Sequence, residues 1–240
     1  MRLRKLIPAI LSIAVIVAPL SPKNKETYGD TPYKQWSLEL VKMIMTKSPW
    51  AQEWGTSTAF DTQSQAGSQA VEGQDEGRNS FVIRLMSALP LRQAYVRYLQ
   101  IVNHYDTMTP EQRQQFDSKV NVLLTADVSQ EIILAVLYKS NVPETTRQLR
   151  QFFATQTTAT LNQSAYLYGP HGRIDLMKYI PPNGEETSAR FVFPRLVDGQ
   201  PVLQPGDKEM RFELWVPPVG QKLQAAFDAK RMVFQGKLDY

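Results

Sequence analysis

The sequence predicts an α+β fold, with helices in the N-terminal half packed on a mainly antiparallel sheet built largely from the C-terminal half. Helical spacing of apolar residues dominates up to Leu161, and short strand-like runs between turn signals follow it. Met210, Phe212, Leu214 and Val216 fall on one face of a pleat and Arg211 and Glu213 on the other, which is typical of a strand with one buried face. Turn sequences such as Asp198-Gly199 recur at spacings that favour an antiparallel meander.

Length and composition favour one domain with a core of its own. The chain has 240 residues, 42% of them hydrophobic and 21% charged, which is ordinary for a globular protein. A domain of this size buries enough surface to fold without a metal ion or a disulfide. We therefore expect a single α+β domain over residues 33–240, preceded by a leader (1–21) and a tether (22–32).

The first residues have the pattern of an export signal. Arg2, Arg4 and Lys5 precede an uncharged apolar run over residues 6–20, as in a secretory signal peptide. This predicts a periplasmic or extracellular location. The cleavage site is poor, so an uncleaved membrane anchor through residues 6–20 stays an alternative; only through this segment do we expect contact with a membrane.

Charge and cysteine content exclude several classes of protein. No cysteine is present, which removes disulfides, thiolate metal sites and a lipid-anchored cysteine. Three of the 27 basic residues lie in the leader, which leaves 24 against 23 acidic residues. Because this balance is nearly neutral and the basic residues do not cluster, we expect no nucleic-acid partner.

Four helices and two early strands are expected in the N-terminal part. The helices are expected near residues 36–44, 90–102, 109–124 and 143–153, and the clearest carries an apolar stripe after Pro90. Phe81–Met86 is predicted to be a strand. Ile132–Tyr138 is apolar on both faces, which predicts a central buried strand.

Two further segments carry predictions of their own. Residues 55–80 are rich in Gln, Ser, Thr and Gly, which predicts a mobile loop or linker, or a short exposed strand pair. Near the end of the chain, Leu223, Ala226 and Phe227 have the spacing of a short helix before the last strand.

Three short boxes resemble an uncharacterised group of exported bacterial proteins. They are Ser48-Pro49-Trp50-Ala51, Phe191–Arg195 and Met232–Leu238. The resemblance implies export and a shared fold. That group has no assigned activity, so the resemblance implies no functional residue.

No linear motif nominates a catalytic, metal or cofactor site. The nucleophile-elbow, dinucleotide and P-loop patterns are absent from the sequence. The two histidines, His104 and His171, lack a ligand partner at metal-site spacing. We therefore predict no catalytic residue, no metal ligand and no cofactor.

Trp50, Trp54 and His171 are the candidate binding residues. On a helix the two tryptophans would share a face at i and i+4, beside the mobile segment, where they could bind a sugar, a peptide or a partner. The alternative is that both pack a helix on the core. His171 stands in the tip of an expected hairpin, where it is a contact residue or polar filler.

These observations favour an exported non-enzymatic module that binds a protein partner or a small ligand. A secreted hydrolase without a recognisable motif is the alternative. A cleft of polar side chains with shifted pKa values would favour the hydrolase, and an exposed apolar or aromatic patch would favour the binding module.

Overall fold

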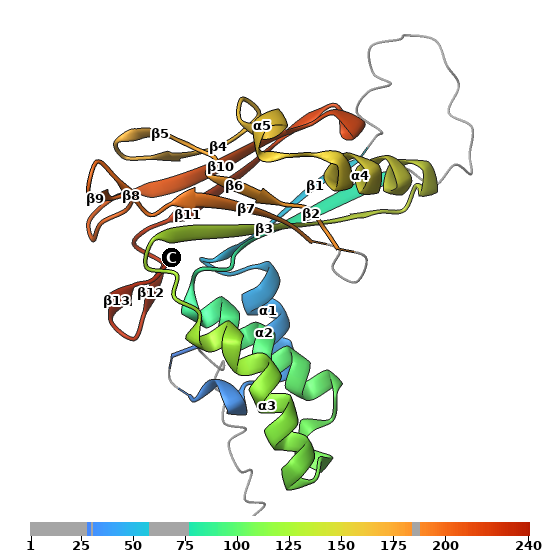
Figure 1. Ribbon diagram of the computed structural model, residues 1–240, viewed down its shortest axis with the longest axis vertical. Coiled ribbons are helices and arrows are strands. Elements are labelled where there is room, and N and C mark those ends of the chain that lie inside the picture. The colour runs from blue at the N-terminus through green and yellow to red at the C-terminus, as the bar shows by residue number, and fades with distance from the viewer. Residues whose placement is uncertain (1–27, 30, 58–76, 184–187) are drawn as a thin grey trace, which may run out of the picture.

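Three layers make up the fold (Figure 1): a four-stranded sheet, a five-stranded sheet and a group of helices below them. The computed structural model describes residues 28–29, 31–57, 77–183 and 188–240. The α+β class and the placing of helices mostly before strands are as the sequence predicts.

The helices lie mostly in the first two thirds of the chain. They are α1 (Leu38–Thr46), α2 (Leu89–Val102), α3 (Pro110–Thr125), α4 (Pro143–Thr155) and α5 (Thr158–Leu161), with short 3-10 turns η1 (Tyr33–Gln35), η3 (Tyr105–Thr107) and η4 (Pro217–Val219). Prolines at the first turns of α2, α3 and α4 fit positions whose backbone amide has no partner within a helix. A capping box between Thr109 and Gln112 fixes the start of α3.

The five-stranded sheet is antiparallel throughout, in the order β1-β2-β3-β7-β6. Its strands are β1 (Ala51–Ser57), β2 (Arg78–Leu85), β3 (Glu131–Ser140), β6 (Lys178–Ile180) and β7 (Ser188–Pro194). The predicted central strand is β3, the middle of the five. Helices α1–α3 lie on the side of this sheet that points away from the other sheet, with α1 against β1 and β2 and α3 against α2 (Figure 1).

The four-stranded sheet is also antiparallel, in the order β11-β10-β4-β5. Its strands are β4 (Ala165–Gly169), β5 (Gly172–Asp175), β10 (Glu209–Val216) and β11 (Gln221–Asp228). Two small hairpins complete the fold: β8 (Leu196–Val197) with β9 (Gln200–Pro201), and β12 (Val233–Phe234) with β13 (Lys237–Leu238).

Aromatic side chains join the two sheets into one core. The rings of Phe191 and Phe193 on β7 lie 5.3 and 6.1 Å from the ring of Phe212 on β10, edge to face. All three are fully buried. Helix α4 closes one end of this sandwich, where Phe153 stacks on Tyr138 at 5.0 Å and accepts a hydrogen bond at its carbonyl from the Tyr179 hydroxyl.

Residues at the end of the sequence tie the layers together. The Asp239 carbonyl accepts a 2.7 Å hydrogen bond from the Trp50 indole, and its carboxylate accepts one of 3.1 Å from the Leu89 amide. Asp239 thus caps the N-terminus of α2 from a distant segment of the chain. The N-cap residue itself, Ala88, has no side-chain oxygen that could accept this hydrogen bond. The Tyr240 hydroxyl donates to the Leu203 carbonyl at 3.0 Å.

Several sequence-based expectations need correction. The segment around Leu223 is strand β11 and not a helix. It pairs with β10, and every second residue (Leu223, Ala225 and Phe227) is buried, which is the pattern of a strand. The C-terminal strands do not form one sheet: β7 belongs to the five-stranded sheet and β10 to the other.

The expected loop and tether also differ at their ends. Residues 55–57 and 78–80 are paired strand residues of β1 and β2, so the strand-pair alternative holds for both ends of that segment. The remainder, residues 58–76, lies outside the described residues, as do the leader and most of the tether. Tyr28, within the tether, packs edge to face on Trp50 at 5.2 Å.

Within the described ranges, none of the helices combines the length and the apolar character that crossing a bilayer requires.

Candidate functional site

The outer face of the five-stranded sheet carries a groove, about 420 Å³ in volume, beside the α2–α3 hairpin. Its floor comes from alternate residues of β2, β3, β7 and β6, and its wall from α2, the end of α3 and the loop after it. The lining consists of Arg84, Met86, Arg92, Tyr95, Val122, Leu123, Ala126, Val128, Glu131, Ile133, Ala135, Leu137, Lys178, Ile180, Ser188, Arg190 and Val192. We call this the sheet groove.

The middle of the floor is apolar although it is not fully covered. Ile133, Ala135 and Leu137 point outward from β3, opposite in direction to the buried Ile132, Leu134 and Val136. Ala135 is buried, whereas Ile133 and Leu137 are only half-buried. The sequence predicts burial on both faces of this strand; the structure buries one face in the sandwich and leaves the other as the floor of the sheet groove.

Two arginines flank Ala135 across the strands. Ala135 pairs directly with Arg84 on β2 and with Arg190 on β7, and Arg190 pairs in turn with Ile180 on β6. Directly paired residues project to the same face of a sheet. One row across the outer face therefore reads Arg84, Ala135, Arg190, Ile180, with the small Ala135 between two arginines.

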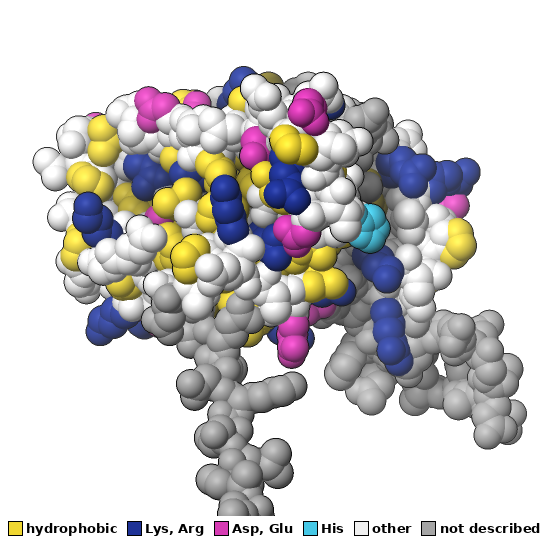
Figure 2. All heavy atoms as spheres, turned by 90° about the horizontal axis from the view of Figure 1, so that it is seen from below, with side chains coloured by type: hydrophobic (Ala, Val, Ile, Leu, Met, Phe, Trp, Pro, Cys, Tyr) yellow, Lys and Arg dark blue, Asp and Glu magenta, His cyan; other side chains and the backbone are white. Residues whose placement is uncertain are grey.

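The charge of the sheet groove is positive. Four basic side chains (Arg84, Arg92, Lys178, Arg190) and one acidic side chain (Glu131) line it. Burial lowers the pKa of Arg84 and of Arg92, but a guanidinium stays protonated at any physiological pH. Figure 2 shows the helical side of the molecule, on which Lys and Arg side chains lie interleaved with hydrophobic ones.

Arginine side chains also fix the walls. The Arg84 Nε donates a 2.7 Å hydrogen bond to the Met45 carbonyl at the end of α1. One Arg92 Nη donates to the carbonyls of Leu123 and Ala126, both at 3.2 Å, at the end of α3. Cations at a helix C-terminus interact favourably with its exposed carbonyls, so these contacts hold α1 and α3 beside the sheet.

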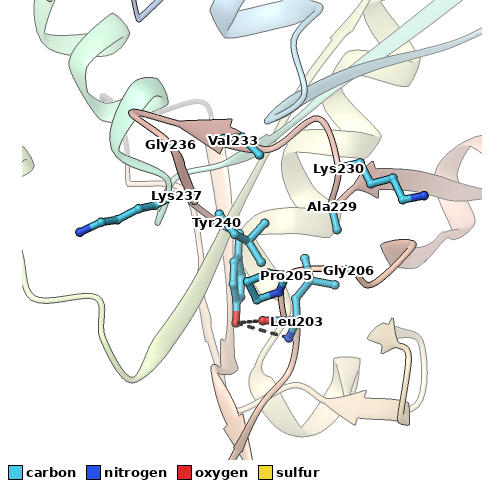
Figure 3. A pocket seen from close by; sticks show the side chains of 10 residues that line it. Leu203, Pro205, Gly206, Ala229, Lys230, Val233, Gly236, Lys237 and Tyr240 are labelled. Atoms are coloured by element: carbon cyan, nitrogen blue, oxygen red, sulfur yellow. Dashed lines mark hydrogen bonds between the residues drawn. The ribbon is translucent and has the colours of Figure 1, made fainter.

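A second hollow, about 500 Å³ in volume, lies beside the C-terminal hairpin (Figure 3). The Tyr240 ring forms one side, and its hydroxyl bonds the backbone of Leu203. Lys230 and Lys237 extend away from each other rather than into the hollow. Because its polar groups do not converge, this hollow is a weaker candidate than the sheet groove.

The three predicted binding residues lie elsewhere and apart from one another. Trp50 is 0% exposed and serves the core, where it also packs on Phe234 at 6.3 Å. Trp54 is half-buried on β1, against Phe81 at 5.9 Å. Trp50 precedes β1 and Trp54 lies within it, so no helix aligns them.

His171 is exposed in the β4–β5 turn, as the expected hairpin places it. It lines a crevice of about 320 Å³ between that turn and the β8–β9 hairpin, with Val197 and Asp198 opposite. This crevice belongs to the other sheet and shares no lining residue with the sheet groove.

Sequence reasoning missed Arg84, Ala135 and Arg190. A signal was present, since each arginine stands alone inside an apolar strand sequence, Phe-Val-Ile-Arg-Leu and Ala-Arg-Phe-Val-Phe. A lone charge at such a position marks a face that reaches solvent. Only the register between distant strands, however, brings the two arginines to either side of Ala135.

Among the described residues, no three His, Asp or Glu side chains gather in a way that would hold a metal ion. In comparisons with known proteins, no family model, no curated protein and no solved structure matches the chain.

Proposed function

We propose that this protein is an exported binding module whose sheet groove holds a small, partly apolar ligand. The observation that carries the proposal is the outward face of β3, where Ile133 and Leu137 are only partly buried in the middle of a sheet. An antiparallel sheet commonly leaves one face open to solvent, and that face normally carries polar side chains, whereas here its centre is apolar. Apolar surface left open beside convergent charged groups is typical of a ligand site.

The groove has the dimensions and the chemistry of a small-molecule site. Its volume of about 420 Å³ lies in the range of roughly 300–1,000 Å³ that such sites occupy. Its lining supplies packing surface and positive charge, which recognise a ligand. Export rests on the basic and apolar pattern of residues 2–20 and on the resemblance to exported bacterial proteins.

A neutral fluorescent probe tests the groove without reference to charge. We expect N-phenyl-1-naphthylamine to bind the full chain with an increase in fluorescence, and Leu137→Glu to weaken that binding about tenfold or more, since it places a carboxylate in the apolar floor. Val197→Glu, at an exposed valine outside the groove, is the matched control and should bind as the wild type does. Equal binding by Leu137→Glu and wild type would contradict the proposal, provided that circular dichroism shows both variants folded.

A further inference from the structure

We infer that the sheet groove, taken as the ligand site proposed above, selects a single-chain amphiphile with an anionic head, and that Arg84 and Arg190 hold this head over Ala135. The inference concerns the class of ligand and its orientation.

The width of the row fits one small anion. Neighbouring strands lie about 4.8 Å apart, so the backbones of Arg84 and Arg190 stand about 10 Å apart across β3. Ala135 contributes only a methyl group between them and is 3% exposed, so the head group lies above the side chains that cover the strand there. Guanidinium groups recognise carboxylate and phosphate oxygens through paired N–H donors.

Apolar residues continue from this row in one covered direction. Ile133 follows on the floor, with Val192 paired beside it on β7. Leu123 and Val128 form the wall near the start of β3, where the Glu131 amide bonds the Val128 carbonyl at 3.2 Å. An alkyl chain laid along this path is packed on two sides.

The acidic charge of the lining favours one orientation. Glu131 faces outward on β3, four residues before Ala135, which corresponds to about 13 Å along the strand. Its carboxylate repels an anionic head from that end of the groove. Arg92 lies at the same end of the groove, but one of its Nη atoms already binds the carbonyls of Leu123, Leu124 and Ala126. The head therefore lies at the arginine row and the tail points toward Leu123 and Val128.

The occupant suited to this arrangement is a single alkyl chain of medium or long length with a carboxylate or phosphate head. The four basic and one acidic lining residues give charge complementarity to an anion, and the apolar path accepts its tail. The volume of about 420 Å³ lies toward the lower end of the small-molecule range, which favours one chain over a two-chain lipid.

Competition against the neutral probe tests the inference. Dodecanoate, dodecyl phosphate, 1-dodecanol and dodecyltrimethylammonium share a tail and differ in the head, and acetate and inorganic phosphate supply the head alone. We expect dodecanoate or dodecyl phosphate to displace N-phenyl-1-naphthylamine about tenfold more tightly than dodecanol. We expect the ammonium compound, acetate and phosphate to be the weakest competitors. The relative strength of the two anionic chains identifies the head.

Variants localise the head. Arg190→Gln should remove most of the preference for dodecanoate over dodecanol, while binding of the probe stays unchanged. Ala135→Leu should weaken binding of dodecanoate, because the larger side chain fills the place of the head group. Arg84→Gln also removes the hydrogen bond to the Met45 carbonyl, so circular dichroism must show that this variant is folded. Arg147→Gln, at an exposed arginine of α4 outside the groove, is the matched control and should keep the preference.

The outcomes separate the two proposals. If the probe does not bind the groove, the proposed function fails. If the probe binds but dodecanol competes as well as dodecanoate, or Arg190→Gln keeps the full preference, the inference is overturned and the groove stands as an apolar site. Tight binding of acetate or phosphate alone would also overturn it, since the tail would then contribute nothing.

Discussion

Glu213 is a charged side chain almost withdrawn from solvent, at 3% exposure, on the outer face of β10. The Tyr166 hydroxyl donates to its Oε2 at 2.9 Å, and Gln224 Nε2 donates to Oε1 at 3.2 Å. Lys222 pairs with the same carboxylate, and the Arg211 Nε lies 3.0 Å from Oε1. Burial alone would raise the pKa of Glu213, but the hydrogen bonds from Lys222 and Tyr166 outweigh it and hold that pKa below its usual value.

A depressed pKa in the folded state gives stability that is present above the pKa of an unfolded glutamate, about 4.3, and is lost as pH falls through the folded value. We expect Glu213→Gln to lower the free energy of unfolding by about 1–3 kcal/mol at pH 7, because Lys222 and Arg211 lose their partner but stay half-exposed. The deficit should shrink below about pH 4. Urea unfolding of both proteins at pH 7 and pH 3.5 measures it, and a deficit independent of pH would speak against this assignment.

The pKa of Asp239 is shifted in the opposite direction to that of Glu213. Burial raises its pKa, against the Leu89 amide and the charges of Arg92 and Arg195, which act to lower it. An acid with a raised folded pKa contributes stability that is present below its unfolded pKa, about 3.9, and is lost as pH rises through the folded value.

Asp239→Asn keeps an oxygen acceptor for the Leu89 amide and removes the charge. We therefore expect the variant to gain stability relative to the wild type as pH rises from about 4 to 7, since only the wild type must ionise a partly buried carboxyl. Thermal unfolding at several pH values checks this. A relative stability that falls over the same interval would show that the pairing with Arg92 and Arg195 dominates.

At the scale of elements, α3 is held by few contacts. Val120 is its one buried residue, and Val122 is 61% exposed on its surface. The Arg92 guanidinium binds the carbonyls of Leu123, Leu124 and Ala126 at its end. Arg92 is thus the side chain of α2 that bonds the end of this helix, which forms the wall of the sheet groove.

Arg92→Met should therefore loosen α3 while the sheet stays intact. We expect amide hydrogen exchange over residues 110–125 to become faster, because three carbonyls at the end of the helix lose their hydrogen-bond donor. Exchange in β3 should keep its rate. Arg147→Met, on the exposed face of α4, is the control. Unchanged protection in α3 would mean that Val120 and its neighbours suffice to hold the helix.

The local sequence pattern predicted most helices and strands, and the pairing between strands determined the remaining ones. The stripe after Pro90 and the apolar run in β3 each predicted one element correctly, because period and burial agree there. Around Leu223 and Trp50 the same residues satisfy a helical and a strand period, so only the pairing with β10 and with β2 decides. The sheet groove depends on strand register and could not be foreseen from local sequence.

At the scale of the whole molecule, one core joins both sheets and the helices. Phe212 lies at its centre, between Phe191 and Phe193 of the facing sheet. Removal of this side chain creates a cavity that both sheets line, so it lowers the stability of the whole fold.

We expect Phe212→Ala to lower the free energy of unfolding by about 3–5 kcal/mol. Because the core is shared, both wild type and variant should unfold in one transition, with coincident curves from tryptophan fluorescence and far-ultraviolet circular dichroism. Two separated transitions would show that the sheets are stabilised independently.

The central claim is that the outward face of β3 is a ligand surface, and methyl NMR of the full chain tests it most directly. Titration with dodecanoate should shift the methyl signals of Ala135, Ile133 and Leu137, together with Val192 beside them, and should saturate. The methyl signals of Val197 and Val233, exposed outside the sheet groove, should not move. Saturable shifts confined to residues away from β3, or no shifts at any concentration below micelle formation, would contradict the account.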